Sequence, residues 1–128
     1  MVQQVTNGIK ISVTSNFEGT NFRNHTLYYG FSYEVTIENQ SNDTVQLLER
    51  QWKIFDSLSK TEIVIGSGVV GQKPVIKPTE IHIYKSNCFL TSSIGSMNGY
   101  YKMVNFSTST IFKVFIPTFQ LMVPSVSN

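Results

Sequence analysis

The stretch YGFSYEVTI at residues 29–37 decides the fold class of this chain. Large aromatic and branched side chains occupy every second position, and small or polar side chains fill the positions between them. Successive side chains of an extended strand point to opposite faces of a sheet, so the pattern predicts a strand with one face in a core and one toward water. The same period of two recurs on both sides of this stretch, which indicates a protein built from strands.

We predict further strands from this period, separated by polar or glycine-rich connections. The expected strands cover residues 9–13, 29–37, 45–56, 63–65, 81–84, 99–106, 111–116 and 119–123. The expected connections include residues 16–26, 39–43, 66–71 and 94–98, and Pro117 is expected to break the strand before it. Ile81 and Ile83 are expected to face the core, which would turn His82 toward solvent.

The pattern predicts an all-β protein, because apolar residues nowhere recur at helical spacing. Short strands at regular intervals indicate an antiparallel β-sandwich of the immunoglobulin/fibronectin type III class, with seven to nine strands in one domain over residues 1–128. The expected core includes Phe31, Val35, Ile37, Trp52, Met103 and Val114.

Composition narrows the range of partners and compartments. Hydrophobic residues make up 41% of the 128 residues and charged residues only 14%, with a net charge of +2. The basic residues are scattered, which disfavours nucleic acid and anionic membranes as partners, since both reward clustered cations. We predict a cytoplasmic protein for three reasons. The chain has a single cysteine, it does not start with the basic and apolar segments of a signal peptide, and it has no apolar run long enough to cross a membrane.

A glycine motif follows the predicted strand over residues 63–65. It matches the dinucleotide-binding pattern G-x-G-x-x-G and is formed by Gly66, Gly68 and Gly71. That pattern binds a pyrophosphate only where a helix begins at the loop, and the prolines at positions 74 and 78 prevent such a helix. We predict a structural loop that does not bind NAD, FAD or ATP. The alternative is a backbone cradle for a phosphate, with Lys73 as the nearby cation.

Arg50 is the unusual residue of its predicted strand, because its position in the alternation places it on the same face as Trp52. One interpretation is a β-bulge, or a position at the end of the sheet where the aliphatic stem packs on Trp52 and the guanidinium reaches water. The other interpretation is contact with a partner, since Arg and Trp are enriched at interface hot spots. Trp52 itself is expected to be mostly buried.

No set of residues predicts catalysis or a metal centre. His25, His82 and Cys88 are too scattered for a zinc site, which normally takes four closely spaced ligands. Glu80 and His82 could hold a transition metal weakly if they shared a strand face. No base is paired with Cys88 in the sequence, so we predict no enzymatic activity and no cofactor.

Several stretches in the second half of the chain resemble the ApaG family. They are QLLERQW (46–52), GSGVVGQKP (66–74), YKS (84–86), LT (90–91), GSMNGYYKM (95–103) and IPTFQL (116–121). The chain departs from the family pattern at Gln51, Thr79 and Phe89, where the family usually has His, Gly and Pro.

The resemblance implies a β-sandwich of the immunoglobulin or fibronectin type without an established enzymatic activity. Domains of the family occur in eukaryotic F-box proteins and in a protein that interacts with a DNA polymerase. Bacterial members are associated with cobalt and magnesium handling, and their genes often neighbour a dinucleoside tetraphosphate hydrolase.

The function predicted from this resemblance is a non-catalytic protein-interaction or adaptor domain. Two alternatives stay open. One is a small-ligand sensor that binds a phosphate or nucleotide at residues 66–71, and the other is an accessory role in divalent cation handling. The predicted binding residues are Arg50, Trp52, Gly66, Gly68, Gly71 and Lys73.

Overall fold

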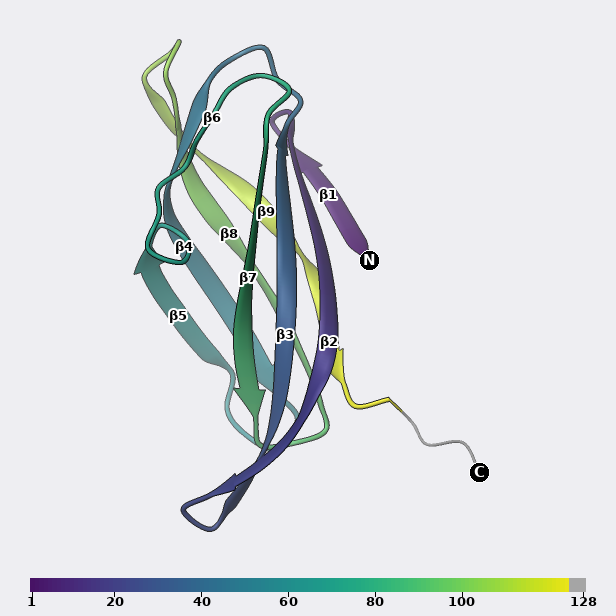
Figure 1. The fold of residues 1–128 in the computed structure, drawn as a ribbon. Coiled ribbons are helices and arrows are strands. Elements are labelled where there is room, and N and C mark those ends of the chain that lie inside the picture. The colour runs from purple at the N-terminus through teal and green to yellow at the C-terminus, as the bar shows by residue number, and fades with distance from the viewer. Residues whose placement is uncertain (125–128) are drawn as a thin grey trace.

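The computed structural model describes residues 1–124 and forms two packed antiparallel sheets (Figure 1). The last four residues of the predicted domain, 125–128, lie outside the described residues. The strands are β1 (Val2–Thr6), β2 (Ile9–Arg23), β3 (Thr26–Asn39), β4 (Val45–Asp56), β5 (Glu62–Ser67), β6 (Val75–Ile76), β7 (Ile81–Leu90), β8 (Ile94–Asn105) and β9 (Thr110–Met122). The described residues contain no helix, which confirms the predicted fold class.

The two sheets have different strand orders. The first sheet runs β1-β2-β3-β7, and the second runs β5-β4-β8-β9 with β6 also paired to β4. No helix in the part of the chain described here is long and apolar enough to cross a membrane. The core lies between the sheets, and all six of the predicted core residues are buried there.

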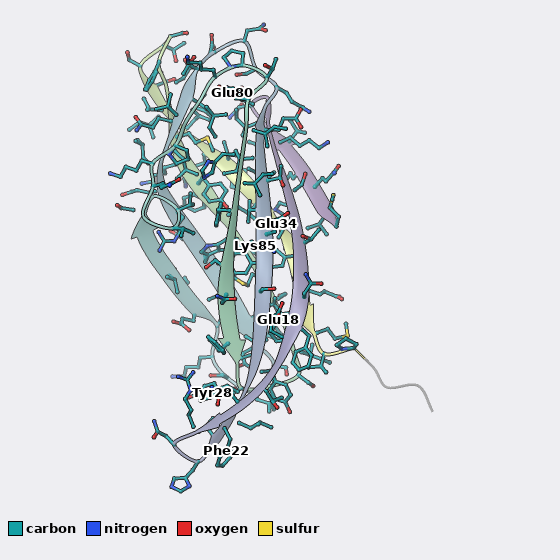
Figure 2. All side chains as sticks on the ribbon, in the orientation of Figure 1. Glu18, Phe22, Tyr28, Glu34, Glu80 and Lys85 are labelled. Atoms are coloured by element: carbon teal, nitrogen blue, oxygen red, sulfur yellow. The ribbon has the colours of Figure 1, made fainter. Side chains whose placement is uncertain are left out.

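The prediction of a loop over residues 16–26 is wrong, because β2 and β3 continue through these residues as a long hairpin. The hairpin turns at Asn24 and His25, which both have positive φ and lie between the paired residues Arg23 and Thr26. This part of the hairpin extends past the core, as Phe22 in Figure 2 shows, so its strands need no apolar alternation. Backbone pairing holds them together, with side-chain contacts such as Arg23 over the Tyr28 ring, and a polarity pattern reveals neither.

The predicted orientation of β7 is also wrong. Tyr84 lies opposite the buried Val35, and His82 lies opposite the buried Ile37. His82 therefore faces inward, and burial lowers the pKa of its imidazole. Ile81 and Ile83 are exposed on the outer face. An edge strand can carry branched residues on its outer face because they suit extended backbone, whether or not they are buried.

β8 and β9 are longer than predicted. Residues 94–98 belong to β8, and β9 continues through Pro117. Gly99 pairs with Ile116 and Met97 pairs with Phe119, so the register shifts where Pro117 lies. A bulge leaves a residue without a ladder hydrogen bond, which is why a proline is tolerated inside this strand.

The sandwich is closed on one side and open on the other. On the closed side, β9 packs against β1 and β2, and Ser15 Oγ donates a hydrogen bond of 2.9 Å to the Gln120 carbonyl. On the open side lie β5 and β7, each the unpaired edge of its sheet (Figure 1). This open side contains the candidate functional site.

Candidate functional site

The position of Arg50 depends on a bulge in β4. The register with β8 shifts between Leu47 and Glu49, so β4 has a bulge just before Arg50. Leu47 and Trp52 are five positions apart, so strict alternation would place them on opposite faces of the sheet. Both face the core because the bulge changes the alternation between them. Arg50 pairs with the fully buried Tyr101, so its side chain starts on the inner face of the sheet.

The guanidinium of Arg50 lies against the glycine motif. A Cβ atom at position 66 would be 2.7 Å from Arg50 Cζ, so only glycine leaves room for this contact. Arg50 Nη1 donates hydrogen bonds to the carbonyl oxygens of Ser67, at 3.1 Å, and Gly68, at 2.7 Å. The arginine therefore holds the end of β5 and the following turn in place.

The rest of the motif forms a tight hairpin. Val69 and Gln72 exchange two backbone hydrogen bonds of 2.7 and 2.9 Å. Between them, Val70 and Gly71 both have positive φ, which corresponds to a type I′ turn. The motif thus lies between extended segments and starts no helix, as predicted.

We expect Gly68→Ala to destabilise the protein by at least about 1–2 kcal/mol, the usual cost of left-handed backbone in a non-glycine residue. Gly68 has a φ of +64°, and a Cβ there would lie 2.2 Å from the Gln72 carbonyl oxygen, so steric overlap adds to that cost. Gly71→Ala is the matched control, because Gly71 also has positive φ but has no atom within 4 Å of an added Cβ. Urea unfolding of both variants measures the difference. Equal destabilisation would contradict the assigned contact.

We also expect no saturable binding of NAD, FAD or ATP at residues 66–71. The amides of Gly68, Val69 and Gln72 already donate to backbone carbonyls, so they do not form a row of free donors toward a phosphate. Titration of each nucleotide into ¹⁵N-labelled protein checks this. Saturable shifts centred on the three glycines at micromolar affinity would contradict it.

The side-chain stem of Lys73 lies beside Gly68, where an added Cβ would be 3.3 Å from Lys73 Cγ, but the lysine side chain is directed away from Arg50 and Trp52. It is exposed and lines a hollow together with Glu49 and Lys102 on the outer side of the second sheet. Arg50 and Trp52, by contrast, line cavities between the sheets. The predicted set is therefore only partly brought together, with Arg50 and Trp52 at the cavities, Gly66, Gly68 and Gly71 in the adjoining hairpin, and Lys73 at the outer hollow.

Two cavities of about 290 and 360 Å³ meet on the open side of the sandwich. We call this space the inter-sheet crevice; the residues that line both cavities are Tyr33, Arg50, Trp52, Ser86 and Asn87. The sequence predicted two of these residues and missed the three on β3 and β7. One signal in the sequence could have identified Tyr33. Its position in the alternation of its strand directs the phenol into the core, where the hydroxyl needs a polar partner.

Buried tyrosines form the polar part of this region. The hydroxyls of Tyr84 and Tyr101 share a hydrogen bond that joins the two sheets. Burial raises the pKa of both phenols and that of Tyr33, so all three are neutral at physiological pH. The region therefore offers neutral hydroxyls beside one guanidinium.

The thiol of Cys88 is buried, and the predicted metal candidates are fewer than a metal centre needs within residues 1–124. Burial raises the pKa of the Cys88 thiol to about 11, and the charges of Glu62 and Asp56 act in the same direction, so the thiol is protonated at neutral pH. Glu80 precedes β7 (Figure 2) and accepts a hydrogen bond of 2.8 Å from the Lys77 amide. Within residues 1–124, no three His, Cys, Asp or Glu side chains come together as a metal site would require.

Comparison with known proteins places the chain in a family. The ApaG domain model matches residues 19–105. Protein ApaG of Beijerinckia indica is 40% identical over 124 residues, covering 97% of this chain and 95% of that protein. Protein ApaG of Caulobacter vibrioides is 43% identical over 99 residues, covering 77% and 70%.

Solved structures agree with this result. The crystal structure of a Bordetella pertussis protein that carries the name ApaA has a TM-score of 0.84 and 34% identity, covering 92% of this chain and 95% of that one. A protein from Archaeoglobus fulgidus, with a TM-score of 0.53 and 8% identity, covers 90% and 98% and shares the fold alone. The sequence and structure matches together show that this chain belongs to the ApaG family.

Proposed function

We propose that this protein is a non-catalytic interaction domain that binds another protein through the open side of its sandwich. The observation that carries the proposal is a set of exposed isoleucines on the two unpaired edge strands. Ile63 and Ile65 lie on the outer face of the second sheet along β5, and Ile81 and Ile83 lie on the outer face of the first sheet along β7, so the two pairs border the open side from opposite faces. Their exposed fractions lie between 55% and 68%.

Unpaired edges offer backbone groups as well as side chains. β5 pairs with β4 along one side only, so its other side presents free N–H and C=O groups. An extended segment of a partner can add to such an edge by backbone hydrogen bonds, while exposed side chains supply selectivity. Apolar side chains beside a free edge favour protein association, because they gain from leaving water.

The two alternatives receive less support. The amides of the glycine turn donate within the backbone, which weakens the case for a nucleotide sensor. A role in cation handling would have to use a site other than a compact cluster of His, Cys, Asp and Glu within residues 1–124. We place the partner in the cytoplasm, because the chain has a single cysteine and that thiol is buried.

Site-specific photo-crosslinking in cells tests the proposal. A photoreactive amino acid at position 65 or 83 should yield a discrete adduct with another protein. The control position is Val5 on β1, which is 54% exposed and lies on the closed side, where β1 packs against β9. Ile81→Lys should abolish the position-83 adduct and Ile63→Lys the position-65 adduct, whereas Val5→Lys should leave both intact. Equal adducts from all three positions, or none from the open side, would refute the proposed surface.

A further inference from the structure

Arg50 lies at the inter-sheet crevice and forms no ion pair with a carboxylate of residues 1–124. The ion pairs within residues 1–124 are Lys85 with Glu34, at 4.0 Å, and Lys102 with Glu49, at 3.5 Å. Arg50 uses Nη1 for two carbonyl oxygens, and its Nε and Nη2 donate to no acceptor in the same part of the chain. A guanidinium offers five N–H donors in a planar fork, so most of its hydrogen-bonding capacity is unused.

The surrounding charges do not neutralise Arg50. Glu62 lines the larger cavity, but it pairs with Ile54, four residues along β4 from Arg50. At the rise of an extended strand, this separation is roughly 13 Å. Lys85 lines the smaller cavity and its ammonium is directed to Glu34 on the outer face of the first sheet (Figure 2). The crevice beside Arg50 therefore carries a positive charge.

The other groups in the crevice are neutral donors and apolar surfaces. Ser86 on β7 supplies a hydroxyl, and Tyr33 supplies a protonated phenol. Trp52 and Val69 supply apolar surface beside them. This combination suits an anion that has one charge and an apolar body.

We propose that the inter-sheet crevice binds a carboxylate on the Arg50 guanidinium, with the apolar part of the ligand against Trp52 and Val69. The guanidinium fork matches a carboxylate with two parallel hydrogen bonds. A phosphate dianion fits less well, because a single guanidinium would have to compensate two charges between apolar walls. The site shares no residue with the four isoleucines of the interaction surface, so failure of the crosslinking experiment would not affect it.

Titration with a matched acid and amide tests the proposal. Phenylacetate and phenylacetamide differ in charge but not in shape, and ¹⁵N spectra report the Arg50 Nε–H and the Nε1–H of Trp52, the one tryptophan of the chain. We expect phenylacetate to saturate both signals and phenylacetamide to bind about tenfold more weakly or worse, as loss of a charge-assisted pair requires. Inorganic phosphate should also bind more weakly than phenylacetate.

A second arm distinguishes a free acid from the end of a peptide chain. Acetyl-Gly-Phe with a free carboxylate and the same peptide with an amidated end are titrated in parallel. Loss of binding on amidation supports the carboxylate site, and the affinity relative to phenylacetate shows which source the crevice prefers.

Variants locate the binding group. Arg50→Lys keeps the charge but removes the fork, and we expect it to weaken phenylacetate binding about tenfold or more. Arg23→Lys, which changes the other arginine of the chain, should have no effect. Should Arg50→Lys disturb the glycine turn, Tyr33→Phe removes a neutral donor instead and should weaken binding by a smaller factor. Equal binding of acid and amide, or an Arg50 signal that stays fixed at saturation, would overturn the proposal.

Discussion

Replacing Trp52 with alanine should lower the free energy of unfolding by about 3–5 kcal/mol, as is typical for removing a large aromatic side chain from a core. Trp52 is only 3% exposed. Its ring makes edge contacts with Tyr33 and Phe119, at centroid distances of 5.3 and 5.9 Å. The substitution removes these contacts and leaves a void between the sheets, which the rigid strands around it cannot fill.

Urea unfolding followed by far-ultraviolet circular dichroism measures this effect, because the variant has no tryptophan fluorescence. Trp52→Phe should cost less, since it retains one aromatic ring in the same space. Phe22→Ala is the matched surface control, because Phe22 is exposed on the β2–β3 hairpin, and it should change stability by no more than about 0.5 kcal/mol. A Trp52→Ala variant as stable as the Phe22 variant would contradict the described core.

The second large effect is expected at Asp56, the last residue of β4. Its carboxylate accepts hydrogen bonds from the Thr91 amide and hydroxyl, both at 2.7 Å, from Ser92 Oγ at 2.6 Å, and from the Leu58 amide at 3.2 Å. Asp56→Ala leaves the amide and hydroxyl of Thr91 without this acceptor at a buried position, so we expect a loss of about 1–3 kcal/mol. Glu62→Ala, which removes a nearby exposed carboxylate, should have little effect in the same urea experiment.

The contribution of Asp56 should depend on pH in acid. Burial by itself would raise the pKa of this carboxyl, but hydrogen bonds from Ser92, Thr91 and Leu58 outweigh burial and hold the pKa below its ordinary value. A group with a depressed folded-state pKa stabilises the fold fully above its unfolded pKa of about 4 and loses that contribution as pH falls through the folded value. The stability difference between wild type and Asp56→Ala should therefore be constant at neutral pH and shrink below about pH 4. A difference that grows in acid would contradict this assignment.

The alternation of side chains predicted the fold class because β3 is a central strand with a buried face. The same rule failed at β7, where Ile81 and Ile83 face solvent and Tyr84 faces the core. On an edge strand, apolarity does not reveal which face is buried, since branched residues favour extended backbone in either orientation. The extent of the β2–β3 hairpin was missed for a related reason, because its end extends past the core, where paired strands need no apolar alternation.

The candidate site could be predicted only within one strand. The unusual position of Arg50 beside Trp52 was visible in the sequence, because both lie on β4. Tyr33, Ser86 and Asn87 come from the facing sheet, and only the register of β3 with β7 brings them to the same crevice. Sequence spacing carries no information about which residues face each other across two sheets.

The sandwich is closed on one side only, so its two sheets should separate first on the other side. β5 is six residues long, has one neighbouring strand and lies at the open side, so its amides should exchange with solvent hydrogen first. β3 and β8 each lie between two long strands and should exchange last, close to the rate of global unfolding. The sheets would then separate from the crevice inward while β9 still holds β1 and β2, and small openings of this kind give molecules in solution access to Arg50 without unfolding the core.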